Sequence, residues 1–361
     1  MGMQRGVSVG SLNSKGTAGV GGHAVDLLCS IIFVSFRANF VPQPGICPMK
    51  TLKAPRLRHG DCIGIVSPAS APTTREKIDK GIRYLEGLGY RVKVGRHVMD
   101  EHGYLAGTDE HRAEDLNEML RDQTVKAIFA IRGGYGTPRL LRLIDYAAVR
   151  RSPKIIVGYS DITALQLALY RKTGLVTFSG PMVGVEMWDS IDPYTEEHFW
   201  RVVTSPAKVG VLKNPGGEPI GVRNPGKARG ILLGGNLSLL LSLFATPYAP
   251  TLRSAVLALE DVDEAPHRID RMFTQLMLSG ILRRIAGLVL GRFTDCVPTD
   301  PSKPHLTVDQ VLEEALQNVL CPVLTNVQFG HIPRKLTLPL GVLAAVDSGA
   351  GRLNVLEGAV R

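Results

Sequence analysis

The sequence lacks the usual signatures of metal sites and of disulfide frameworks. Its five cysteines form no Cys-x-x-Cys pair, and no His-Glu-x-x-His motif or Cys/His cluster occurs. We therefore expect neither a metal nor a cofactor. An odd number of thiols fits reduced cysteines in a cytoplasmic protein better than paired ones. They are Cys29, Cys47, Cys62, Cys296 and Cys321.

Aromatic residues and clustered cations are also scarce. Phe, Trp and Tyr make up 6% of the chain, and the net charge of +9 comes from dispersed Lys and Arg, with pairs such as Arg150-Arg151 as the longest runs. Nucleic-acid binding needs clustered cations and aromatic side chains for stacking, so we expect no such partner. The charge remains compatible with a small anionic substrate. The apolar run at 27–36 is too short to span a bilayer, so we expect no membrane partner.

Residues 1–48 differ in composition from the rest of the chain. They are rich in Gly, Ser and Val and show no helical or strand period. We expect a disordered extension, or a start codon placed too early, because Met49 opens a segment that looks like a natural beginning.

From Asp61 onward, short apolar runs alternate with amphipathic stretches. This β-α-β-α rhythm predicts a parallel sheet with helices on both faces, and binding sites in such sheets gather at the carboxyl ends of the strands. The periodicity predicts strands at 62–67, 90–94, 127–131 and 155–157, and helices at 74–88, 109–121, 138–144 and 162–170.

The composition changes between residues 205 and 227 to Pro, Gly, Lys and Asn, which predicts a linker or an exposed hairpin. We therefore expect an N-terminal domain at 49–204 and a second domain at 228–361. In the second we expect strands at 256–259, 287–290, 323–327, 342–346 and 353–356, and an amphipathic helix at 265–279.

Ser160 lies in a turn, Gly158-Tyr159-Ser160-Asp161, between a predicted buried strand and a helix. A serine on such an elbow exposes its hydroxyl at a helix N-terminus, where amide dipoles favour developing negative charge. The second glycine of Gly-x-Ser-x-Gly is missing, so Ser160 or Asp161 as a simple helix cap remains an alternative.

The glycine-rich loop at 133–136 permits close backbone approach, which suits an oxyanion hole, a phosphate cradle or only a tight turn. A serine nucleophile also needs a base and an orienting acid. Glu260 ends one predicted strand and His331 follows another, so the two can converge on one cleft. Taken singly, a capping carboxylate and a loop histidine are the simpler interpretations.

From Met49 to Glu357 the chain resembles the LD-carboxypeptidase family of serine peptidases, which includes muramoyl-tetrapeptide carboxypeptidases and microcin C immunity proteins. Seven ordered blocks over about 300 residues carry the resemblance, whereas residues 1–48 have no counterpart. The blocks are Leu57-Arg58-His59-Gly60-Asp61 with Ser67-Pro68, Arg132-Gly133-Gly134-Tyr135-Gly136, Gly158-Tyr159-Ser160-Asp161-Ile162-Thr163, Gly234-Gly235-Asn236-Leu237, Leu259-Glu260-Asp261-Val262, Arg268-Ile269-Asp270-Arg271-Met272, and Phe329-Gly330-His331 with Leu338-Pro339-Leu340-Gly341.

The resemblance implies Ser160 as nucleophile, His331 as general base and Glu260 as its orienting acid. It implies an oxyanion hole made by the backbone N–H groups of Gly134 and Asp161. It further implies a flavodoxin-like N-terminal domain, a smaller β-rich C-terminal domain, and a homodimer. The triad would then assemble across the two domains.

The implied activity is release of the C-terminal D-alanine from the murein tetrapeptide during cell-wall recycling. Hydrolysis of a microcin C-like peptidyl-aminoacyl-nucleotide is the nearer alternative, favoured by an aromatic platform in a C-terminal loop. A non-catalytic binding module is the farther one. The substrate carboxylate needs a cation, and the sequence leaves four candidates open: Arg132, Arg268, Arg271 and Arg334.

Overall fold

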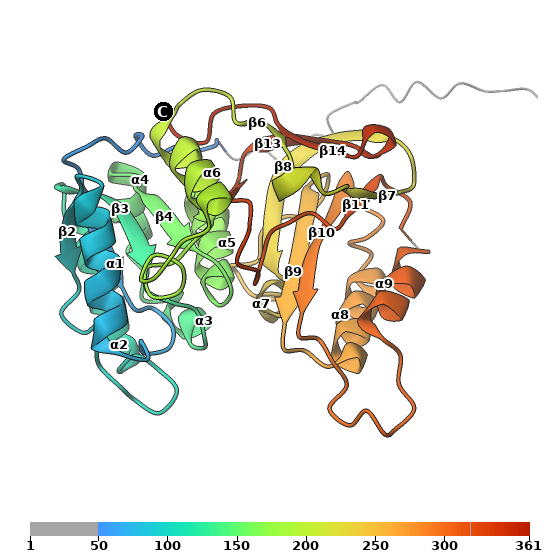
Figure 1. Cartoon of the computed structure of the whole chain (residues 1–361), viewed down its shortest axis with the longest axis horizontal. Coiled ribbons are helices and arrows are strands. Elements are labelled where there is room, and N and C mark those ends of the chain that lie inside the picture. Colours follow the sequence, from blue (N-terminus) through green and yellow to red (C-terminus); the bar gives the residue numbers. More distant parts are fainter. Residues whose placement is uncertain (1–49, 318) are drawn as a thin grey trace, which may run out of the picture. The chain divides into compact units, whose positions relative to one another are not determined.

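Strands and helices alternate in the first half of the protein, as the sequence predicts. A computed structural model describes residues 50–317 and 319–361, so the expectation for residues 1–48 lies outside the described residues. Figure 1 shows these elements in blue to green. They are β1 (Cys62–Val66), α1 (Arg75–Gly87), β2 (Arg91–Val94), α2 (Asp109–Arg121), β3 (Val125–Ala130), α3 (Thr137–Leu140), α4 (Tyr146–Arg151), β4 (Ile155–Gly158), α5 (Ile162–Thr173), β5 (Thr177–Ser179) and α6 (Pro193–Thr204).

The first sheet has the strand order β12-β5-β4-β3-β1-β2. The five strands from β5 to β2 pair in parallel, which is the flavodoxin-like order and confirms the expected α/β class. The order reverses between β1 and β3, so the loops after these strands and after the neighbouring β4 face one crevice at the carboxyl edge. Residues of α1 and α6 pack on one face of this sheet, and residues of α2, α4 and α5 pack on the other.

The second half carries a larger sheet and further helices, drawn from green to red in Figure 1. The predicted amphipathic helix at 265–279 is confirmed as α8. The elements are β6 (Gly210–Leu212), η1 (Pro215–Gly217), β7 (Gly221–Arg223), β8 (Lys227–Asn236), α7 (Leu237–Ser242), β9 (Val256–Val262), α8 (Pro266–Leu278), β10 (Gly287–Thr294), α9 (Val308–Leu316), β11 (Val323–Thr325), β12 (Leu338–Leu340), β13 (Leu343–Asp347), η2 (Ser348–Ala350) and β14 (Arg352–Val355).

This second sheet has the order β6-β14-β13-β8-β9-β10-β11-β7. Its four central strands, β8 to β11, are parallel, and the outer strands are antiparallel. Asn236 pairs in register with Glu260 at the carboxyl ends of β8 and β9. Parallel strands bring their carboxyl ends to one edge, so this sheet also presents polar residues at that edge.

Two segments that connect the halves form strands of the two sheets instead of a simple linker. Residues 205–227, which we expected to form a linker or hairpin, contribute β6 and β7 to opposite edges of the second sheet. Strand β12 pairs antiparallel with β5 of the first sheet. Residues 49–361 accordingly form one compact unit.

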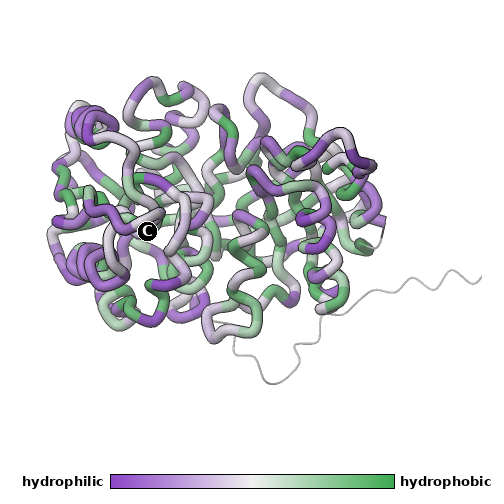
Figure 2. The backbone as a smooth tube through the Cα atoms, turned by 90° about the horizontal axis from the view of Figure 1, so that it is seen from below, coloured by the Kyte–Doolittle hydropathy of each residue, from purple (hydrophilic) through white to green (hydrophobic). Residues whose placement is uncertain are grey.

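The core follows the sequence hydropathy. Figure 2 shows hydrophilic residues mainly on outer helices and turns, and the buried strand residues of both sheets join two large apolar clusters that each draw on both halves. Among the described residues, we find no helix with the length and apolar character needed to cross a membrane.

Candidate active site

Ser160 occupies a strained turn between β4 and α5. Its φ is 65°, in the left-handed region that a serine rarely adopts, and such strain costs roughly 1–3 kcal/mol and clusters at functional sites. Asp161 stands at the N-cap position of α5, as one of the alternatives had it, but among the described residues no side-chain hydrogen bond caps this helix. The hydroxyl of Ser160 is therefore not used to begin the helix.

The glycine loop after β3 lies directly against this turn. A Cβ on Gly133 would come within 2.7 Å of the Ser160 Cβ and 2.9 Å of its Oγ. Gly134 has a φ of 122°, and a Cβ there would lie 2.2 Å from the Ser70 Oγ. Side chains at these two positions would displace the serine or the loop. The glycines thus allow the backbone N–H groups to approach Ser160.

The two N–H groups expected to form the oxyanion hole belong to Gly134 and Asp161. Within residues 50–317 and 319–361, neither N–H donates a hydrogen bond. The Asp161 carboxylate accepts a hydrogen bond of 2.7 Å from the N–H of Thr137, just after the glycine loop. Burial raises the pKa of Asp161. Asp161 thus ties the loop to the turn that holds Ser160.

Glu260 and His331 come together in the structure. Glu260 lies in β9 and is 2% exposed, and its Oε2 lies 2.7 Å from the Nδ1 of His331. A histidine that donates through Nδ1 to a carboxylate keeps Nε2 available as a proton acceptor. The close approach depends on Gly330, where a Cβ would lie 2.5 Å from the same carboxylate oxygen.

A buried ionic network that we did not predict lies behind His331. The ring of Tyr159 meets the imidazole edge-on at 4.9 Å between centroids, and the Nζ of Lys335 lies 3.9 Å from the Tyr159 ring centroid. Glu186 Oε1 accepts hydrogen bonds from Lys335 at 2.5 Å and from the Tyr159 hydroxyl at 2.8 Å. Burial raises the pKa of Tyr159. The network fixes the ring that supports His331.

Residues from three of the segments that carry the family resemblance link the two halves of the chain beside the site. The Asn236 N–H donates to the Thr163 hydroxyl at 3.1 Å, and its side-chain amide donates to Asp261 at 2.8 Å. Burial raises the pKa of Asp261, which adjoins Glu260, to about 6. Helix α5 is thereby linked to the strand that carries the acid.

Ser160 and His331 line one pocket of ≈ 380 Å³, together with Gly133 and Gly134. A neighbouring pocket of ≈ 360 Å³ shares Tyr159 and His331 with it. Among the described residues no hydrogen bond joins the serine hydroxyl to the imidazole, and such bonds are often long without substrate. The geometry suits a serine nucleophile served by a histidine base and a buried acid.

The structure separates the four candidate arginines. Arg132 is the one among them that lines the Ser160 pocket, where the unpredicted Lys77 and Trp188 also lie. Arg268 pairs with Glu264 and Arg334 with Asp192. Arg271 is not among the described residues that line this pocket. Lys77 lies 4.4 Å from the Trp188 ring centroid, and with Arg132 it makes two cations in the wall of the Ser160 pocket.

Comparison with known proteins matches both halves of the chain to one family. Residues 63–180 match the family described as LD-carboxypeptidase N-terminal domain, and residues 229–346 match its C-terminal domain. The probable murein peptide carboxypeptidase of Bacillus subtilis is 40% identical over 309 residues, covering 85% of this chain and 95% of the relative.

Two solved structures share the fold. Muramoyltetrapeptide carboxypeptidase from Oxalobacter formigenes has a TM-score of 0.71 and 33% identity, over 82% of this chain and 98% of its own. MccF in complex with glutamyl sulfamoyl guanosine has a TM-score of 0.77 and 28% identity, over 86% of this chain and 100% of its own.

Proposed function

The chain belongs to the LD-carboxypeptidase family and is a serine-type carboxypeptidase, and from this premise we propose that it releases the C-terminal D-alanine of the murein tetrapeptide with Ser160, His331 and Glu260 as its triad. The observation that carries the proposal is the 2.7 Å contact between Glu260 and His331, whose imidazole lines the same pocket as Ser160.

The proposed reaction is acyl transfer followed by hydrolysis. The Ser160 Oγ attacks the carbonyl carbon of the terminal amide while Nε2 of His331 takes the hydroxyl proton. The amide C–N bond then breaks, and His331 returns the proton to the leaving nitrogen. Water, deprotonated by the same imidazole, cleaves the ester and regenerates the serine. Glu260 stabilises the imidazolium in both halves of the cycle.

The N–H groups of Gly134 and Asp161 would stabilise the negative oxygen that forms in each step. They lack acceptors among the described residues, and one such donor typically contributes a factor of roughly 10²–10³ in rate. The tie between Asp161 and Thr137 supports this role, because it anchors the glycine loop to the turn that carries Ser160 and Asp161.

Arg132 is our candidate for binding the terminal carboxylate of the substrate. It lines the pocket beside Ser160 with Lys77 as a second cation, and a guanidinium binds a carboxylate through paired hydrogen bonds. A carboxypeptidase needs such a cation next to its nucleophile. The site would thereby select a chain end over an internal amide.

We further propose that the protein acts in cell-wall recycling, in the cytoplasm and as a homodimer. Free thiols at Cys62, Cys296 and Cys321 agree with a reducing compartment. Light scattering on the purified protein measures the assembly directly: a mass of one chain at working concentration would refute the dimer.

Cleavage of a microcin C-like nucleotide is the second candidate, prompted by the likeness to MccF. For that activity we expect a C-terminal loop to supply an aromatic side chain on which the base stacks. Among the described residues, three aromatic side chains line the two site pockets: Tyr159, Trp188 and His331. The first two come from the first half of the chain. This makes the tetrapeptide the better-supported substrate. A non-catalytic binding module would not need the Glu260–His331 pair.

The test is incubation with disaccharide tetrapeptide and measurement of released D-alanine, with Ser160→Ala as the control. The wild type should release it and the variant should not. Equal inertness would refute the tetrapeptide as substrate, and a parallel assay with a peptidyl-aminoacyl-nucleotide would then decide between the two hydrolases. Inertness toward both, with ligand binding retained, would favour the binding module.

A further inference from the structure

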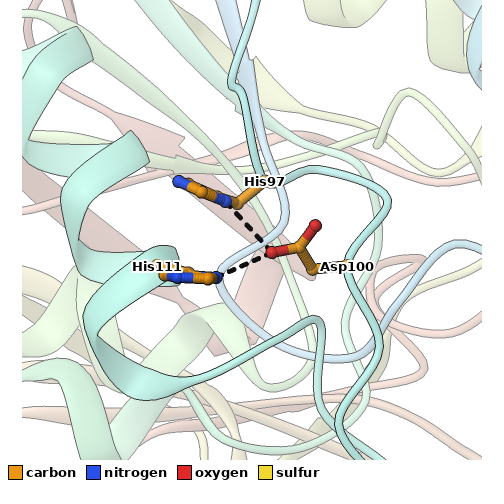
Figure 3. Close-up of side chains that lie close together, drawn as sticks. All are labelled: His97, Asp100 and His111. Atoms are coloured by element: carbon orange, nitrogen blue, oxygen red, sulfur yellow. Dashed lines mark hydrogen bonds and ion pairs between the residues drawn. The ribbon is translucent and has the colours of Figure 1, made fainter.

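Outside the active site, the structure brings together three side chains that the sequence did not mark as a group. His97 and Asp100 lie in the turn after β2, and His111 lies in the first turn of α2. Figure 3 shows both imidazoles directed at one oxygen of Asp100. The Nδ1 atoms of His97 and His111 lie 3.0 and 2.8 Å from that oxygen. These three side chains are not among the described residues that line the Ser160 pocket.

We propose that His97, Asp100 and His111 form a binding site for a divalent transition-metal ion, with Zn²⁺ as the best match. Two imidazoles and one carboxylate, with water in the fourth position, are a ligand set that zinc accepts. Zinc bonds of about 2.0–2.2 Å to N and O in a tetrahedron separate neighbouring ligand atoms by roughly 3.4 Å. The two observed nitrogen–oxygen separations are slightly shorter, so binding requires each imidazole to move about half an ångström from the carboxylate oxygen.

Backbone contacts fix the relative positions of the three residues before any metal binds. The Asp100 N–H donates to the His97 carbonyl at 3.0 Å, which closes the turn, and the His97 N–H donates to Asp115 of α2 at 2.9 Å. Gly107 makes room for Asp100, since a Cβ there would lie 2.8 Å from the Asp100 Cβ. The turn and the helix are thus fixed to each other by contacts that do not involve the ligand atoms.

The surroundings of His97 also fit a metal ligand. A histidine that binds metal usually directs its other ring nitrogen toward a carboxylate, and Glu114 Oε2 lies 3.8 Å from the His97 Nε2.

The side chains can be reached from solvent and can adjust. The exposed fractions are 22% for His97, 37% for Asp100 and 44% for His111. The imidazoles are stacked at 4.0 Å between centroids and 20° from parallel. A metal lies in the plane of each imidazole that binds it, so coordination needs the rings to tilt, which their exposure permits.

The site adjoins the loop system of the active site without being part of it. The chain between Asp100 and His111 contains Tyr104, whose carbonyl accepts a hydrogen bond of 2.6 Å from Ser70. The Ser70 hydroxyl in turn accepts the Tyr135 N–H at 3.1 Å, one residue after Gly134. A bound ion would clamp both ends of the segment that supports the glycine loop, as a structural rather than a catalytic ion.

The test is calorimetric titration of the full chain, freed of metal by chelator, with ZnCl₂ at pH 7.5, together with Co²⁺ as a spectroscopic probe. The wild type should bind one Zn²⁺, melt at higher temperature when loaded, and give a Co²⁺ spectrum of low coordination number.

Asp100→Asn and His111→Ala should each weaken zinc binding by at least about tenfold, the smallest loss seen even for outer partners of a metal ligand. His267→Ala, an exposed histidine of α8, is the matched control and should bind as the wild type does. Melting in chelator verifies that each variant folds, and His111→Gln replaces any variant that does not. Absence of binding up to about 1 mM zinc, or equal binding by the cluster variants, would refute the site.

Discussion

Gly330 lies against the carboxylate of Glu260 so closely that a Cβ at residue 330 would come within 2.5 Å of the Oε2 that binds His331. Its φ of 102° is also one that side chains rarely adopt. The acid–base pair therefore depends on a residue that has no chemistry of its own.

We predict that Gly330→Ala lowers kcat by about a hundredfold or more, because a displacement of about 1 Å at a catalytic group has that effect. Steady-state assays of D-alanine release measure it. Gly87→Ala, where a Cβ would meet nothing within 4 Å, is the control. Unchanged kcat in folded Gly330→Ala would mean that the Glu260–His331 contact is not needed.

Arg132→Ala should raise KM by about tenfold or more, because a charge-assisted hydrogen bond contributes roughly 1.5–3 kcal/mol. A smaller change in kcat is expected, since the carboxylate is bound in both ground and transition states. Arg334→Ala removes an exposed cation paired with Asp192 and should leave KM unchanged. Equal effects of the two substitutions would exclude Arg132 as the specific contact.

Lys335→Met should lower the free energy of unfolding by about 3–5 kcal/mol, because it leaves the buried Glu186 without its cation. The two side chains are 3% and 9% exposed. The double variant Lys335→Met/Glu186→Gln should recover much of the loss in urea unfolding. Additive losses in the double variant would show that the two charges do not act as a pair.

The protein should lose stability in mild acid through His198. Burial lowers the pKa of this histidine to about 3, and its Nδ1 accepts the Thr337 N–H at 3.1 Å. In the unfolded chain the imidazole of His198 takes up a proton near pH 6.5, whereas in the folded protein it stays neutral down to about pH 3. The free energy of unfolding therefore falls as the pH drops from about 6.5 to about 3.

From this group alone, we expect a loss of about 2 kcal/mol between pH 7.5 and pH 5. His198→Asn keeps an acceptor for Thr337 but does not titrate, and its urea midpoint should depend less on pH over this range. A pH dependence identical to that of the wild type would place the protonation elsewhere.

Most of the first sheet could be predicted because its strands are apolar runs followed by amphipathic helices. Two of the missed strands have physical reasons. Strand β5 has three residues, too few to show a period. Strand β12 contains Pro339, which argues against a strand except at a sheet edge, and β12 is an edge strand of the first sheet. Its partner β5 lies about 160 residues earlier, a pairing that no local pattern reveals.

The site could be predicted only in part for the same reason. Glu260 and His331 follow apolar strands and belong to recognisable blocks, and the structure brings them into contact. Lys335 gives no signal, because a lysine is rarely buried unless it is paired, and Glu186 lies far from it in sequence. His97, Asp100 and His111 follow no known metal spacing. The turn and helix that unite them are fixed by tertiary packing.

The claim that Ser160 is the nucleophile is tested most directly by rapid acid quench of the enzyme with murein tetrapeptide, followed by intact-mass and peptide-mapping mass spectrometry. We predict an adduct with the mass of the substrate minus D-alanine, attached to the peptide that contains Ser160 and absent from Ser160→Ala. An adduct on another residue, or D-alanine release by Ser160→Ala at the wild-type rate, would contradict the account.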